Sequence, residues 1–175
     1  MKRSAKVAFG GIFSALAVVS MLLTVFPYAT YALPAIAGVF LLPIALQCGS
    51  RWGLGGYVVT AILAFLLAPD MEAKLLFVLF FGYYPILKLW LDGLNTALQW
   101  TLKLLLFNGA AVGGYLLLYW VVGLPADAFQ LFGVNLPLVF LALGNVVFII
   151  YDRGVHNLVL LYEIHWRDKL TRFWR

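Results

Sequence analysis

The most constraining feature of this sequence is a succession of apolar runs, each close to the roughly 20 residues that a helix needs to cross about 30 Å of hydrocarbon. Charged residues make up 11% of the chain and hydrophobic residues 65%, whereas soluble domains carry about 25% charged residues. Inside a bilayer every backbone polar group must be bonded within the protein, and a helix achieves this alone. The sequence therefore predicts an all-α integral membrane protein without a separate soluble domain.

Prolines, glycines and charges between the runs predict where the helices end. We expect a single domain, residues 1–175, that forms a compact bundle of six transmembrane helices. The predicted spans cover about residues 7–26, 33–48, 54–68, 73–91, 98–122 and 136–151. In residues 152–175 apolar side chains recur every three or four positions between charged ones, which is typical of an amphipathic helix. This C-terminal tail is expected to continue the sixth helix out of the bilayer or to lie along its surface.

The positions of lysine and arginine predict the orientation of the bundle. With a cytoplasmic N-terminus, every basic residue except Lys74 falls on the cytoplasmic side, as the positive-inside rule requires. Both termini are then cytoplasmic, and the chain is a multi-pass protein of a bacterial cytoplasmic (inner) membrane, with the lipid bilayer as its first partner. The net charge is +5, but the basic residues lie between hydrophobic runs and do not form a basic face on a soluble module. Nucleic acid is therefore not an expected partner.

Residues 80–88, with the sequence FFGYYPILK, are the least lipid-like part of the fourth span. The predicted topology brings polar side chains of four spans to a similar depth in the inner half of the membrane. Unpaired polar groups are costly in hydrocarbon, so these side chains should face the interior of the bundle. The predicted inner polar hub consists of Gln47, Tyr83, Tyr84, Asn108, Asn145 and Asp152. Two interpretations stay open: interhelical hydrogen bonds that set the packing, and a polar cavity or coupling surface.

Charges at the inner boundary allow a second polar layer. Lys88 is placed to pair with the Asp152-Arg153 dipeptide across the ends of the fourth and sixth spans. The alternative is that the lysine extends along the apolar surface to the lipid headgroups.

The first span carries a stripe of small side chains at Ala8, Gly11 and Ala15. Such a face lets another helix approach closely, either from the same chain or from a partner protein. We therefore predict a partner-helix face along the cytoplasmic half of this span.

Catalytic and metal-binding patterns are not evident. The outer carboxylates Asp70 and Glu72 are two residues apart, which points them in different directions on a helix. His156 and Glu163 are separated by seven residues, with His165 off that face, and no further ligands lie nearby. We predict no enzymatic activity, no metal and no cofactor.

Several of these features together resemble a known family. Six short helices, the basic start Lys2–Lys6, the small-residue stripe of the first span and the passage from Leu41–Gln47 to Gly53–Gly56 resemble the substrate-binding S components of energy-coupling factor transporters. The resemblance implies that the first helix meets a coupling transmembrane subunit with its ATPases, and that a small molecule binds towards the outer face. The candidate ligand-binding residues are then Tyr28, Tyr31, Asp70, Glu72, Gln130 and Asn135.

A second resemblance concerns two short segments. Residues 80–88, and the N-x-x-F-x-x-Y-D pattern that ends at Asp152, are similar to segments of a broad bacterial family of membrane proteins of unknown function. Three functions therefore compete. The first is an S-component-like subunit, the second is a non-catalytic scaffold of the MreD type that organises other envelope proteins, and the third is a lipid-binding or lipid-modifying protein.

Overall fold

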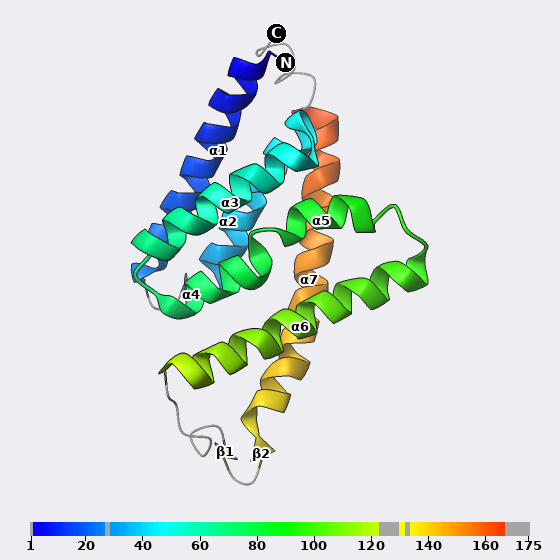
Figure 1. The fold of residues 1–175 in the computed structure, drawn as a ribbon. Helices are drawn as coiled ribbons and strands as arrows, with labels where there is room; N and C mark the ends of the chain where they lie inside the picture. Colours follow the sequence, from blue (N-terminus) through cyan, green and yellow to red (C-terminus); the bar gives the residue numbers. More distant parts are fainter. Residues whose placement is uncertain (1, 27–28, 123–129, 132–133, 167–175) are drawn as a thin grey trace.

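The computed structural model describes residues 2–26, 29–122, 130–131 and 134–166, and these form a helical protein (Figure 1). The helices are α1 (Arg3–Leu22), α2 (Ala32–Cys48), α3 (Ser50–Leu67), α4 (Met71–Leu76), α5 (Tyr84–Leu91), α6 (Thr96–Val122) and α7 (Leu136–His165). A 3₁₀ turn (Leu23–Val25) follows α1, and a π-helical turn (Phe77–Phe81) follows α4. The two-residue strands β1 (Gln130–Leu131) and β2 (Val134–Asn135) pair antiparallel, with Gln130 opposite Asn135.

The helices include segments of membrane-spanning length. Within the described residues, four are long and apolar enough to cross a bilayer: Arg3–Val25, Ser50–Leu67, Met71–Leu91 and Thr96–Leu117. Ala32–Cys48 is apolar but shorter. The predicted helical architecture with apolar, membrane-compatible segments is therefore confirmed.

The first three helices pack together, and a single residue connects the second to the third. Gly49 alone reverses the chain between α2 and α3, with a φ of 98° that L side chains rarely adopt. As a result α3 begins at Ser50, four residues before the predicted start of the third span. α1 packs on α2 and α3 through buried Phe9, Ala17 and Met21.

The predicted fourth span, 73–91, is broken into two helices. The Gly82 N–H donates to the Phe77 carbonyl oxygen at 2.8 Å, five residues back, and α5 then begins with Pro85 in its first turn. Proline lacks an N–H and fits a helix start, so the break precedes it. α2 approaches this break closely, because a Cβ on Gly38 would lie 1.9 Å from the Phe81 carbonyl oxygen. The least lipid-like part of the predicted fourth span thus contains a break in the helix, and α2 packs against it.

α7 continues without interruption through the predicted boundary between the sixth span and the tail. Its C-terminal half runs beside α2, and the two helices together line open apolar grooves that include Val39 and Leu158. The apolar side of the amphipathic segment therefore faces α2 across these grooves as far as Trp166, and residues 167–175 lie outside the described residues. α1 begins and α7 ends at the same end of the molecule (Figure 1).

Candidate functional site

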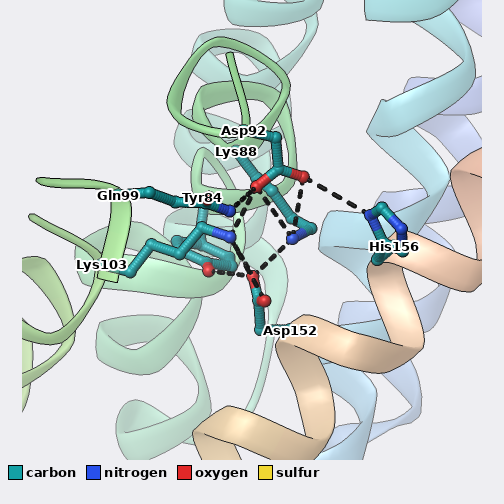
Figure 2. Close-up of polar contacts among 7 residues, drawn as sticks. All are labelled: Tyr84, Lys88, Asp92, Gln99, Lys103, Asp152 and His156. Atoms are coloured by element: carbon teal, nitrogen blue, oxygen red, sulfur yellow. Dashed lines mark hydrogen bonds and ion pairs between the residues drawn. The ribbon is translucent and has the colours of Figure 1, made fainter. Parts of the chain in front are cut away.

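A cluster of charged and hydroxyl side chains joins α5, α6 and α7 (Figure 2). Tyr84, Lys88 and Asp92 recur every four residues from the first residue of α5 to the one after its last, so they share one face of this helix. Lys103 extends from α6 and Asp152 from α7 to meet them. We call these five residues the charge cluster.

Asp152 is the buried centre of the charge cluster. Its Oδ1 accepts hydrogen bonds from the Tyr84 hydroxyl and from Lys88 Nζ, both at 2.6 Å, and its Oδ2 accepts one from Lys103 Nζ at 3.2 Å. Lys88, Lys103 and Asp152 are 1%, 0% and 2% exposed. Buried charges are tolerated when they are paired and hydrogen-bonded, and here both ammoniums have carboxylate partners. Of the two interpretations for Lys88, the structure shows pairing with Asp152.

Asp92 closes the charge cluster on its more open side. Its Oδ1 accepts from Lys103 Nζ at 2.6 Å and from Gln99 Nε2 at 2.7 Å, and its Oδ2 lies 3.0 Å from Lys88 Nζ. His156 Nδ1 is 3.7 Å from the same Oδ2. Burial by itself would raise the pKa of Asp92, but hydrogen bonds from Lys103 and Lys88, and their positive charges, outweigh it and hold the pKa below its ordinary value of 3.8.

Aromatic rings pack against Tyr84 of the charge cluster. Phe80 stacks on Tyr84 with ring centroids 4.6 Å apart, and Phe107 stacks on Phe148 at 4.9 Å. Tyr84 and Phe148 make an edge contact at 5.3 Å. Phe80 and Phe148 thus hold the ring of Tyr84, whose hydroxyl donates to Asp152.

A separate amide pair joins α6 and α7, at a position after Lys103 on α6 and before Asp152 on α7. Asn108 and Asn145 donate to each other's carbonyl oxygens at 3.0 and 2.9 Å, and each also donates to the carbonyl oxygen four residues before it. The structure therefore divides the predicted inner polar hub: Tyr84 and Asp152 belong to the charge cluster, while Asn108 and Asn145 form the amide pair. Tyr83 packs against the rings of Tyr57 and Phe80, and Gln47 lies near the end of α2.

The predicted ligand-binding residues are partly brought together. The Tyr31 hydroxyl donates to Glu72 at 2.8 Å, and Thr30 donates to Asp70 at 2.7 Å. Asp70 also caps α4 by accepting from the N–H groups of Glu72 and Ala73. Burial and then the hydrogen bond to Glu72 raise the pKa of Tyr31 to about 12. These contacts tie the α1–α2 connection to the start of α4.

The other predicted ligand-binding positions are less fully described. Gln130 and Asn135 oppose each other in the β1–β2 pair, and their side chains lie outside the described part of the structure. Tyr28 lies outside the described residues altogether.

The predicted partner-helix face points away from the bundle. Ala8, Gly11 and Ala15 are all exposed, and a Cβ added to Gly11 would have no atom within 4 Å. α1 uses its opposite side for packing.

Sequence reasoning did not assign Asp92, Gln99 or Lys103 to a site. Two signals pointed to them: Lys88 and Asp92 have the spacing of a helical ion pair, and Lys103 is a cation within an otherwise apolar run. Among the residues that the structure describes, no group of three or more His, Cys, Asp or Glu side chains is arranged to hold a metal ion. Comparison with protein-family models, curated proteins and solved structures finds no match for this chain.

Proposed function

We propose that this chain is a non-catalytic, multi-pass subunit of a bacterial cytoplasmic membrane, of the S-component type, which binds a small molecule and couples to a membrane partner. The chain crosses the membrane six times, and both of its termini lie in the cytoplasm. Four apolar helical segments of sufficient length support the membrane assignment. The common end at which α1 begins and α7 ends supports placing both termini on one side of the membrane.

The observation that carries the coupling proposal is the exposed small-residue face of α1. Ala8, Gly11 and Ala15 leave a flat surface beside larger exposed apolar residues such as Ile12 and Leu16. Small residues allow close backbone approach between membrane helices, which stabilises association through van der Waals packing. The proposed partner is a coupling transmembrane subunit that carries an ATPase pair.

Co-purification from native membranes tests this proposal. Wild-type protein should retain the coupling subunit and ATPases, and Gly11→Leu should lose them because the added side chain separates the helices. Gly55→Leu on α3 is the matched control, since a Cβ at Gly55 also has no atom within 4 Å. Equal recovery of ATPases with both variants would contradict coupling through α1.

The proposal of a small-molecule site rests on the hydrogen bonds between the α1–α2 connection and the start of α4. Tyr31, Asp70 and Glu72 present a phenol and two carboxylates at one end of the bundle. Mass spectrometry of small molecules released from the purified protein should recover a ligand from wild type and less of it from Glu72→Gln. No difference between these proteins would reject this location.

A scaffold of the MreD type is the second candidate, and one observation favours it. The outer polar residues bond to one another, whereas the buried charges gather between α5, α6 and α7. A scaffold needs rigid helices and no ligand. Recovery of envelope-assembly proteins without any ATPase would support the scaffold and reject the S-component assignment.

The proposed topology has its own test. Cys48 is the sole cysteine in the sequence, so a Cys48→Ala background permits single reporter cysteines at Ser4 and Lys74. A membrane-impermeant thiol reagent added to intact cells should label the position 74 reporter and spare the position 4 reporter. The opposite labelling would overturn the orientation.

A further inference from the structure

Donor groups converge on Asp92 in the manner of an anion-binding site. Lys88 Nζ and Lys103 Nζ lie 3.0 and 2.6 Å from its carboxylate oxygens, and Gln99 Nε2 lies 2.7 Å away. The His156 ring stands at the edge, 3.7 Å away, with its side chain 51% exposed. Figure 2 shows these donors approaching Asp92 from α6, α7 and its own helix.

The position of Asp92 is explained by the cations and not by its own helix. It follows the last residue of α5, where the helix dipole favours positive charge. Gly93 comes next, in a turn that links α5 to α6. The Asp92 side chain is 25% exposed, whereas Lys88, Lys103 and Asp152 are almost fully buried. Asp92 is therefore the most accessible charged member of the cluster, and the contacts of Lys88 and Lys103 with Asp152 do not depend on it.

Charge balance shows what would replace it. With Asp92 in place, two ammoniums face two carboxylates. When Asp92 turns away, Lys88 and Lys103 share only Asp152, so the buried group carries one net positive charge. An uncompensated buried charge is costly, and an anion that enters the vacated position removes this cost.

We infer that Lys88, Lys103, Gln99 and His156 form an oxyanion-binding site, which Asp92 occupies when no ligand is bound and which takes the carboxylate or phosphate group of a small molecule. This inference goes beyond the proposed function, because it involves neither the α1 face nor the outer connections. Asp92 acts as a tethered competitor for the ligand. If Asp92 occupies the site about nine-tenths of the time, the apparent affinity of a ligand falls about tenfold.

Thermal unfolding of the purified protein in detergent tests the site. Sodium acetate and sodium phosphate are titrated against sodium chloride at matched ionic strength, so that general screening is subtracted. Wild type should show a saturable rise in midpoint with acetate or phosphate. Asp92→Ala should reach half of its rise at a concentration at least about tenfold lower, because the competitor is gone.

Two further variants keep the test decisive. Asp92→Asn retains the side-chain shape without the charge, and serves if Asp92→Ala does not fold. Gln99→Glu places a carboxylate beside the lysines on the half-buried rim, and should abolish the anion response while the protein stays folded. Equal responses to acetate, phosphate and chloride in both Asp92 variants would overturn the inference, as would an unchanged response in Gln99→Glu.

An additional experiment with a lipid distinguishes binding of free anions from binding of lipid headgroups. Phosphatidylglycerol is added to the same detergent solution in place of the free anions. Stabilisation of the Asp92 variants by free acetate or phosphate supports a small-molecule site, and stabilisation by phosphatidylglycerol alone overturns it. Because these measurements use the purified chain without ATPases, they can fail while the coupling proposal stands, and the reverse also holds.

Discussion

Replacing Asp152 by asparagine is the sharpest test of the charge cluster. The substitution keeps the side-chain shape but leaves Lys88 and Lys103 buried with Asp92 as their one remaining carboxylate partner in the cluster. Asp152 accepts close hydrogen bonds from both ammoniums. Two bonds to charged groups at about 1.5–3 kcal/mol each give about 3–6 kcal/mol, which agrees with the roughly 3–5 kcal/mol lost when one partner of a buried ion pair is removed.

The measurement is the free energy of unfolding in detergent micelles, followed by tryptophan fluorescence. Asp152→Asn should lower it by about 3–5 kcal/mol. Arg153→Gln is the control, because Arg153 is exposed beside Asp152 and its loss should cost less than about 1 kcal/mol. Adding Lys88→Met to Asp152→Asn removes one uncompensated charge, so the double variant should be more stable than Asp152→Asn alone.

Two results would refute this reasoning. If Asp152→Asn unfolds within about 1 kcal/mol of wild type, the buried cluster does not hold the three helices together. If Lys88→Met adds its own full cost to that of Asp152→Asn, the two side chains are energetically independent.

Three other predictions concern packing, the amide pair and pH. Asn145→Leu should destabilise the protein by about 1 kcal/mol, since Asn108 loses both of its hydrogen bonds to residue 145. The loss should exceed that of Asp70→Asn, which keeps a helix cap. Equal, near-wild-type midpoints in thermal unfolding would contradict this. Gly38→Ala should lower the free energy of unfolding by at least the roughly 1–3 kcal/mol typical of overpacking, because its Cβ would meet a backbone carbonyl oxygen at 1.9 Å. Gly55→Ala is the control and should be neutral, since its Cβ would meet no atom within 4 Å. Similar denaturation curves for the two variants would refute the close approach. The lowered pKa of Asp92 contributes stability that is present above pH 3.8 and is lost as pH falls through the lower pKa of the folded state. Between about pH 5 and 3 the thermal unfolding midpoint of wild type should therefore fall more than that of Asp92→Asn. Parallel profiles would show that this carboxylate does not contribute.

Local composition determined the helices of this protein. Apolar runs predicted the helical regions, although the single span predicted over residues 73–91 is divided into α4 and α5. They could do so because the apolar character of a segment and the hydrogen bonding of a helical backbone depend on residues that are neighbours in the chain. Gly82 and Pro85, which both weaken a continuous helix, lie at the break in the fourth span.

The pairing of polar side chains was decided by the tertiary structure. A sequence gives the approximate height of a residue along its helix, but not the rotation of that helix or its shift against its neighbours. Predicted heights therefore grouped Tyr84 with Asn108 and Asn145, whereas the packing of α6 against α7 separates the amide pair from the charge cluster. The same packing turns Lys103 inward to meet Asp152, 49 residues away in the chain.

The sequence by itself thus determined a helical chain with apolar segments of membrane-spanning length, because these properties are local. Tertiary structure alone decided that the buried residues Lys88, Lys103 and Asp152 meet the half-buried Asp92 in one cluster, and that the small-residue face of α1 remains uncovered. Both depend on how helices turn and slide against each other, and this is set by the summed packing of side chains that lie far apart in the sequence.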